Sequence, residues 1–123
     1  MATPCSIRME LPTGESKSVY CHWDGYPGHT GRILSECYNT TEKVRELLEL
    51  GSLSVLGKKV KPDAGDNHSF ENPTEGVTIA FHRDRGDDLH TADVGTGYAY
   101  NYKWDGKIWS RSYSCTIWKT LKY

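Results

Sequence analysis

The sequence predicts an α+β domain, with an antiparallel sheet of about five strands and two helices inserted between the second and third strands and packed on one face. Apolar and polar residues alternate in several short segments, which is typical of half-buried strands. Between residues 29 and 50 the apolar residues instead recur about once per helical turn. The chain has 123 residues, of which 37% are hydrophobic, so we expect residues 1–123 to form a single domain around one core.

The first hairpin is predicted from two alternating segments, residues 6–11 and 17–23, separated by the turn sequence PTGES. Successive side chains of a strand point to opposite faces, so Tyr20 and His22 are expected to share the face turned away from the core. The residues expected to face the core are Ile7, Met9, Leu11, Val19, Cys21 and Trp23.

Two helices are expected next. A turn rich in glycine leads into the first helix, over residues 29–38. Asn39 or Thr40 then caps the second helix, with Glu42 at the capping-box distance from Asn39, and Gly51 ends it.

The middle of the chain alternates between structured and loop-like segments. Residues 51–57 are expected to make a short turn, and residues 58–76 a long surface loop with Val60 and Phe70 as its apolar anchors. Residues 77–83 alternate again and predict a third strand.

The last hairpin is predicted over residues 98–104 and 107–118, joined by a turn at Asp105 and Gly106. It carries many aromatic residues and an arginine, more than one buried face requires. We therefore expect part of this hairpin to be an interface in a homodimer or larger oligomer, although the same residues also suit a ladder of cross-strand pairs or a platform for stacking bases. The predicted interface residues are Tyr98, Tyr100, Tyr102, Trp109, Arg111 and Tyr113.

Composition restricts the possible partners. The net charge of -1 does not favour a protein that grips long duplex nucleic acid, and no apolar run is long enough to span a membrane. The four cysteines form no CxxC pair and the five histidines are scattered, so we expect reduced thiols, no metal site and no cofactor. These features suit a soluble protein of the cytoplasm.

A first candidate binding site lies around the turn that follows the second strand. Tyrosines could stack on a planar ligand, a histidine or carboxylate could bond to a base edge, and an arginine at a helix start could bind an anion. The alternative is an ordinary strand end with an Asp-Gly turn. The predicted ligand-binding residues here are Tyr20, His22, Asp24, Tyr26, His29 and Arg32.

A second candidate site is the segment FHRDRG, where Arg83 and Arg85 flank Asp84. Two guanidinium groups suit a phosphate, with the carboxylate holding one of them in place. The alternative is a solvated loop in which these charges neutralise one another.

Catalysis receives little support. His22 with Asp24, or His82 with Asp84, could form an acid-base pair, but no nucleophile elbow, phosphate loop or metalloprotease motif is present. We therefore do not expect an enzyme, and a small hydrolase remains the alternative.

Three segments, VYCHWDGYPGHTGRIL, YNTTEKVRELLELGSLSVLG and FHRDRG, resemble a group of small phage and prophage proteins with YCHWDGY, LGxLSxLG and GRDRG motifs. The resemblance covers residues 17–57 and 81–86. This chain departs from that pattern at its N-terminus, MATPCS where MGTRS is expected, and at His82, where the pattern has glycine.

The resemblance implies an accessory protein that acts in the cytoplasm of an infected bacterial host. Together with the aromatic and arginine residues, it favours a non-enzymatic protein that sequesters a small nucleotide immune signal, of the cyclic oligonucleotide or cyclic ADP-ribose type. The alternative is a protein-protein inhibitor of a host defence effector or nuclease that uses the aromatic hairpin.

Overall fold

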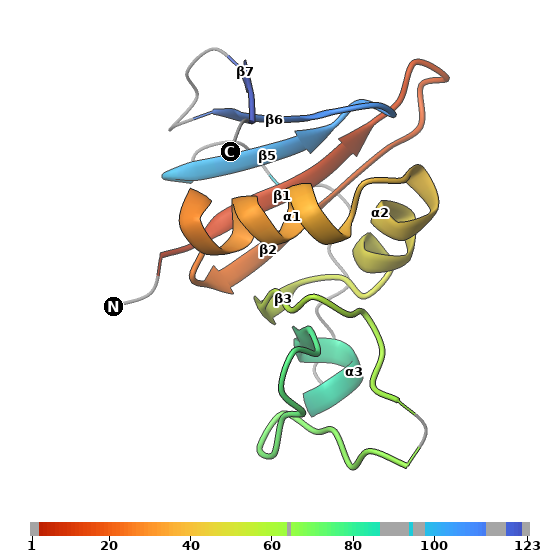
Figure 1. Cartoon of the computed structure of the whole chain (residues 1–123), viewed down its shortest axis with the longest axis vertical. Coiled ribbons are helices and arrows are strands. Elements are labelled where there is room, and N and C mark those ends of the chain that lie inside the picture. Colours follow the sequence, from red (N-terminus) through yellow and green to blue (C-terminus); the bar gives the residue numbers. More distant parts are fainter. Residues whose placement is uncertain (1–2, 64, 87–93, 95–97, 113–117, 122–123) are drawn as a thin grey trace.

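A computed structural model describes residues 3–63, 65–86, 94, 98–112 and 118–121 of the chain. The described strands form one mixed sheet in the spatial order β4-β3-β2-β1-β5-β6-β7, and helices pack against it, so the α+β class is confirmed (Figure 1). The strands are β1 (Cys5–Glu10), β2 (Ser16–Trp23), β3 (Leu53–Val55), β4 (Ile79–Ala80), β5 (Tyr100–Trp104), β6 (Trp109–Ser112) and β7 (Lys119–Thr120).

The expectation of an antiparallel sheet of about five strands is wrong. β1 pairs in parallel with β5, and β2 pairs in parallel with β3, whereas the other neighbours are antiparallel. The parallel pairing of β2 with β3 uses residues 53–55, which were expected to lie in a turn. The small and glycine residues around Leu53 do not alternate clearly between apolar and polar, so periodicity does not predict this strand. Its pairing with neighbouring strands defines it.

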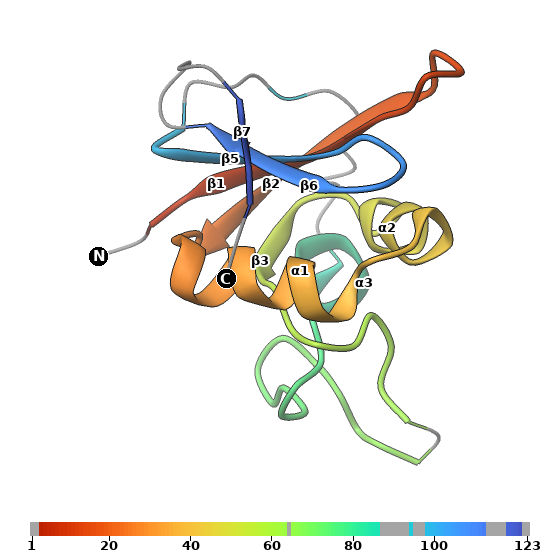
Figure 2. The same cartoon turned by 45° about the horizontal axis from the view of Figure 1, so that its top comes forward.

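The helices on one face of the sheet are short. A π-helical turn, η1 (Pro27–Gly31), runs into α1 (Arg32–Cys37), and α2 (Thr41–Leu48) follows on the same side (Figure 2). The side chain of Thr40 accepts a hydrogen bond from the backbone N–H of Lys43, so Thr40 is the N-cap. The capping box expected between Asn39 and Glu42 is therefore wrong. None of the helices in the described ranges has the length and apolar character needed to cross a bilayer.

The core lies between these helices and the sheet. The alternation predicted for the first hairpin is confirmed at Val19 and Cys21, which are fully buried, but Trp23 is 43% exposed. The error at Trp23 has a local cause, since the strand ends there and the next residue, Asp24, has a φ of +55°. The indole of Trp23 instead packs edge-on against the ring of His22, with centroids 4.8 Å apart.

Two tryptophans connect the C-terminal hairpin to the helices. The ring centroids of Trp104 and Trp109 lie 5.6 Å apart across β5 and β6. Trp104 donates its indole N–H to Thr41 Oγ1 at 3.0 Å, and Trp109 donates to the carbonyl of Tyr38 at 2.8 Å. Each aromatic side chain therefore both fills the core and satisfies a polar group near a helix end.

The turn between β5 and β6 is closed by a side chain. The carboxylate of Asp105 accepts the backbone N–H groups of Lys107 and Ile108, and Gly106 has a φ of +104°. The predicted turn position is confirmed, and glycine is needed there because few other residues adopt that backbone conformation.

Residues 58–63 and 65–86 form a lobe that projects beyond the sheet and helices (Figure 1). The strand expected over residues 77–83 ends at Ala80, because α3 (Phe81–Arg85) begins immediately after it. Phe81 packs on Phe70, with ring centroids 5.8 Å apart, and its backbone N–H bonds to the carbonyl of Ser52 at 3.2 Å. These tertiary contacts outweigh the local alternation that favoured a strand.

At the base of the lobe, Gly57 crosses Thr78, the residue that precedes β4. The hydroxyl of Thr78 accepts the N–H of Gly57 at 3.0 Å, and Tyr38 donates its hydroxyl to the carbonyl of Gly57 at 2.8 Å. A Cβ atom on Gly57 would lie 2.6 Å from the backbone carbon of Val77 and 2.7 Å from the N atom of Thr78. The two backbones approach so closely that only glycine fits.

We predict that Gly57→Ala lowers the free energy of unfolding by about 2 kcal/mol or more, because the added methyl group can be accommodated only by separating two backbone segments. Urea denaturation measures the change. Gly28→Ala is the matched control, since its Cβ would meet only Tyr26 side-chain atoms at 3.5 Å. An equal, small effect of both substitutions would contradict the close crossing.

Burial of the Tyr38 hydroxyl predicts sensitivity to alkali. Burial raises the pKa of Tyr38 from its ordinary 10.0 to about 12, although the bond with Thr78 acts in the opposite direction. The unfolded chain therefore loses this proton first, so the stability contributed by Tyr38 decreases as the pH rises from 10 toward 12. Denaturation at a series of alkaline pH values should show a smaller decrease in Tyr38→Phe than in the wild type.

Candidate functional site

The predicted cluster around residues 20–32 is divided between the two faces of the sheet. On the face away from the helices, the hydroxyl of Tyr20 lies 2.5 Å from Nδ1 of His22. The ring of Tyr98 lies 5.4 Å from that of Tyr20, and burial raises the pKa of Tyr20. These three side chains interact with one another as a small polar and aromatic cluster.

Asp24 lies in the turn that connects β2 to the π-helical turn η1. Its carbonyl accepts the hydroxyl of Thr30 at 2.7 Å, and the next residue, Gly25, donates its N–H to Thr3 and accepts the hydroxyl of Tyr102, both at 2.7 Å. A Cβ on Gly25 would lie 2.7 Å from the Cβ of Cys5. The backbone of this turn is therefore held on several sides, which matches the ordinary structural alternative for the Asp-Gly pair.

Tyr26, His29 and Arg32 lie on the helical side of the sheet. Tyr26 is 42% exposed, and its ring centroid is 6.3 Å from that of His29. Nε2 of His29 lies 3.1 Å from the carbonyl oxygen of Leu56. Of the predicted cluster, His29 and Arg32 line a hollow in the surface.

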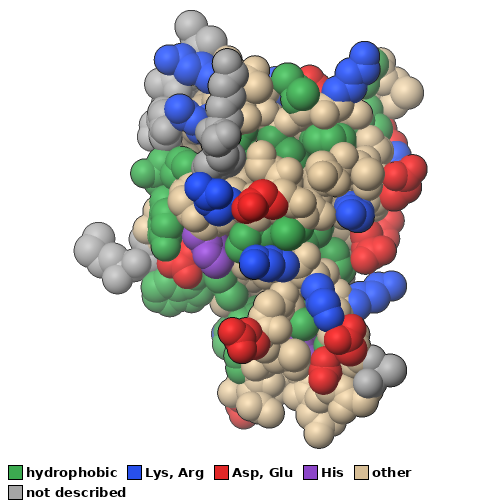
Figure 3. Space-filling model, in the orientation of Figure 1, with side chains coloured by type: hydrophobic (Ala, Val, Ile, Leu, Met, Phe, Trp, Pro, Cys, Tyr) green, Lys and Arg blue, Asp and Glu red, His purple; other side chains and the backbone are tan. Residues whose placement is uncertain are grey.

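That hollow is one part of a groove between α1 and the lobe. A smaller hollow of about 320 Å³ adjoins a larger one of about 540 Å³, because His29, Ile33 and Lys58 line both. Figure 3 shows the molecule narrowing between its main body and the lobe, with basic side chains on both sides of the narrowing. The groove is defined by the residues of these two hollows.

The two hollows differ in chemistry. The smaller one has Arg32 and Lys58 at its rim, with Glu36 3.8 Å from Arg32. The larger one is mostly apolar, and Glu75 and Lys58 are its charged residues. Its apolar lining comes from Ile33, Val55, Leu56, Pro73, Val77 and Ile79.

Several of these groove residues lie outside the clusters that the sequence singled out. Lys58 and Pro73 are in the segment expected to be an unremarkable surface loop, and Val55 and Ile79 were assigned only structural roles. No local motif distinguishes them, because the groove forms only where the lobe lies against α1. The sequence signals for this surface were the predicted ligand residues His29 and Arg32 and the helical periodicity around Ile33.

Arg83 does not face a ligand site. Its guanidinium donates to the carbonyl of Thr78 at 2.6 Å and to the carbonyl of Val60, and it holds both carboxylate oxygens of Asp84 at 2.9 and 3.1 Å. The prediction of Arg83 as an anion ligand is therefore corrected: this side chain joins α3 to both ends of the lobe segment.

Asp84 is the second charged residue in this network of hydrogen bonds inside the lobe. It accepts the N–H of Ala80 at 2.8 Å, and Nε2 of His68 lies 3.2 Å away. Nδ1 of His68 accepts the N–H of Thr74 at 2.9 Å. Burial raises the pKa of Asp84, but the hydrogen bonds from Arg83 and Ala80 outweigh it and hold that pKa below its ordinary value. Asp84 therefore remains a carboxylate that accepts hydrogen bonds.

Arg85 has a different environment. Its guanidinium carbon lies 4.5 Å from the ring centroid of Phe70 and 4.9 Å from that of Phe81. The guanidinium group of Arg85 lies over the faces of both phenylalanine rings, so it covers the contact between Phe70 and Phe81 inside the lobe. The sequence had predicted that Arg83 and Arg85 bind one anion together. In the structure Arg83 contacts Val60, Thr78 and Asp84, whereas Arg85 lies against Phe70 and Phe81.

The predicted interface residues are placed largely inside the fold. Tyr102 is completely buried and Trp109 is 3% exposed, so neither offers surface to a partner. Tyr100 packs against the core, and Arg111 is half-buried beside Tyr102 in the register of β5 and β6. Tyr98 contacts Tyr20, and Tyr113 lies outside the described residues. The alternative named above, a ladder of cross-strand pairs within the sheet, accounts for the burial of Tyr102 and Trp109.

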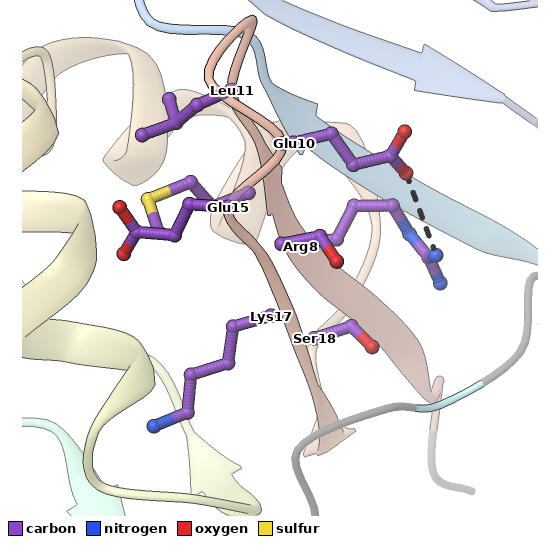
Figure 4. Close-up of a pocket in the computed structure, with 9 residues that line it drawn as sticks. Arg8, Glu10, Leu11, Glu15, Lys17 and Ser18 are labelled. Atoms are coloured by element: carbon purple, nitrogen blue, oxygen red, sulfur yellow. Dashed lines mark ion pairs between the residues drawn. The ribbon is translucent and has the colours of Figure 1, made fainter.

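A further hollow of about 270 Å³ lies at the β1–β2 hairpin (Figure 4). Three of its four charged residues are already paired: Arg8 lies 3.9 Å from Glu10 and donates to the carbonyl of Val94, and Glu15 accepts two hydrogen bonds from Arg45. Glu15 and Lys17 point to the opposite side of the hairpin from Arg8 and Glu10 (Figure 4). These charges do not converge, so this hollow is a weaker candidate than the groove.

Neither predicted acid-base pair is formed. His22 bonds to Tyr20, while Asp24 belongs to the turn, and the carboxylate of Asp84 is turned toward Arg83 and Ala80. The described residues contain no group of three or more histidine, cysteine, aspartate or glutamate side chains suited to a metal ion. No protein-family model, curated protein or solved structure matches this chain.

We predict that Arg83→Lys lowers the free energy of unfolding by about 2 kcal/mol, because a single ammonium group cannot reproduce the planar fork that reaches Val60, Thr78 and Asp84. Chemical denaturation measures the loss, and amide exchange at Val77 reports the opening of the lobe. Arg85→Lys is the control, since lysine keeps a cation near the two phenylalanine rings and should change stability by less than about 0.5 kcal/mol. Unchanged stability in Arg83→Lys would contradict the structural role.

Proposed function

We propose that this protein binds a small nucleotide in the groove between α1 and the lobe and releases it unaltered. One observation carries the proposal: a hollow with cationic side chains directly adjoins a larger apolar hollow. A nucleotide has the same two parts, an anionic phosphate and a planar base. The combination of an apolar wall with a few polar groups is typical of small-molecule sites.

The size of the groove is compatible with this ligand. Hollows of about 320 and 540 Å³ fall within the range of ordinary ligand sites, which is roughly 300 to 1,000 Å³. In the proposed arrangement the phosphate lies near Arg32 and Lys58, and the base lies against the side chains of Ile33 and Val77. Gly57 and Gly76 are among the residues that line the larger hollow.

Glu36 influences the anion-binding end. It lies one helical turn after Arg32, and the two side chains are both more than half exposed. Such an exposed pair contributes little to stability, so a phosphate can replace the carboxylate as the partner of Arg32 at low cost. In the absence of ligand, Glu36 reduces the positive field at this end of the groove.

The contacts of His22 and Asp84 support a binding role more than a hydrolytic one. Of the four candidate acid-base residues, His22 and Asp84 are already engaged in contacts within the fold, away from the groove. The biological part of the proposal, sequestration of a cyclic oligonucleotide or cyclic ADP-ribose signal, is implied by the resemblance to phage proteins. The groove is formed by a single chain, so nucleotide capture does not require an oligomer.

Native mass spectrometry tests the proposal. The protein is mixed with a panel of cyclic dinucleotides, cyclic trinucleotides, cyclic ADP-ribose isomers and adenosine 5′-monophosphate. We expect at least one of them to be retained and to have an unchanged mass after denaturing release. Retention of none of these compounds would overturn the proposal, and release of a chemically altered compound would favour the hydrolase alternative.

We predict that Lys58→Met weakens binding of the retained nucleotide by about 10-fold or more, since one charge-assisted hydrogen bond is lost. Isothermal titration calorimetry measures the dissociation constants. Lys43→Met removes the same charge from an exposed position on α2 and should leave the affinity within about 2-fold. Glu36→Gln should strengthen binding, because it removes the carboxylate that competes for Arg32. Equal effects at Lys58 and Lys43 would place the ligand elsewhere.

A further inference from the structure

His29 has a fixed hydrogen-bonding character. Its Nε2 lies 3.1 Å from the carbonyl oxygen of Leu56. A carbonyl oxygen can only accept a hydrogen bond, so Nε2 must carry the hydrogen. In a neutral imidazole the other nitrogen, Nδ1, then has a free lone pair and acts as an acceptor.

His29 lies where a bound ligand could donate a hydrogen bond to Nδ1. His29 lines both hollows of the groove, at the junction between the cationic end and the apolar end. Among the contacts made by the described residues, Nδ1 has no hydrogen-bond donor assigned to it. The Leu56 contact also holds the ring in place, because Leu56 itself is buried.

We infer that His29 selects the base: the groove prefers nucleotides whose base carries an exocyclic amino group, which donates to Nδ1 of His29 while the phosphate lies near Arg32 and Lys58. This inference rests on the proposed function and adds the chemical class of the base. Adenine-type bases satisfy it through the 6-amino group. A base with only hydrogen at that position cannot donate there.

The selectivity has a physical origin in desolvation. When a flat base covers the groove, water is removed from Nδ1, and the lone pair must find a donor on the ligand or remain unsatisfied. A site that hydrogen-bonds a ligand group discriminates strongly against an analogue lacking that group, for the same reason. The apolar side chains of Ile33 and Val77 carry no donor, and apart from His29 itself the donor side chains that line the larger hollow are those of Lys58 and Thr74.

The test compares two ligands that differ in one group. Adenosine 5′-monophosphate carries the 6-amino donor, and purine riboside 5′-monophosphate has hydrogen in its place. We expect calorimetry to show that the wild type binds the first at least about 10-fold more tightly than the second. Ribose 5-phosphate, which has no base, measures the contribution of the anionic end alone.

Two substitutions at His29 separate the roles of its nitrogens. In His29→Gln the amide nitrogen lies near the position of Nε2, so the bond to Leu56 can be kept while the acceptor at Nδ1 is lost. In His29→Asn the amide oxygen lies near the position of Nδ1, so the acceptor is kept while the Leu56 bond is lost. We expect the preference for the amino base to fall to about 1-fold in the first variant and to be retained in part in the second.

The outcomes distinguish this inference from the proposed function. If none of the three probes binds and the nucleotide panel is also not retained, the proposed function fails. If both nucleotides bind equally well to the wild type, the function stands and the selection by His29 is overturned. Nitrogen-15 NMR of the free protein gives an independent check, because a hydrogen found on Nδ1 of neutral His29 would also overturn the inference.

Discussion

The crossing of Gly57 with Thr78 is the constraint on which the rest of the molecule depends. At this point the chain leaves the sheet for the lobe and returns to it, and the two backbones are too close to admit a side chain. Tyr38, the residue that ends α1, donates its hydroxyl to Gly57 and receives the indole N–H of Trp109 on its carbonyl. One tyrosine thus joins the helix, the C-terminal hairpin and the base of the lobe.

The groove follows from this arrangement. Its two walls are α1 and the segments on either side of the crossing, and both walls contact Tyr38 or its immediate neighbours. The lobe itself has little apolar interior, so charge-assisted hydrogen bonds around Arg83 and Asp84 hold its ends together. Such bonds are directional, and they fix the position of the wall more closely than apolar contacts alone would.

Sequence reasoning found elements whose signals are local and missed those that depend on distant partners. The hairpin of β1 and β2 and the N-cap of α2 were predictable from alternation and capping chemistry. The short strand β3 and helix α3 were not, because pairing and packing define them. At the candidate site, His29 and Arg32 were named from the sequence and line the groove, whereas Lys58, which also lines it, carries no motif. Arg83 looked like a ligand contact because sequence cannot show which way a guanidinium points.

The parallel pairing of β1 with β5 also affects how the chain folds. Ser6 and Asn101, which share a hydrogen bond of 2.7 Å, are separated by 95 positions in the sequence. Strand β1 therefore cannot pair with β5 until residues 100–104 have been synthesised. Until then the edge of β1 that will pair with β5 is exposed. Pairings of such long sequence separation slow folding, and an exposed edge invites association with other chains. Folding of this protein is thus expected to depend on completion of β5.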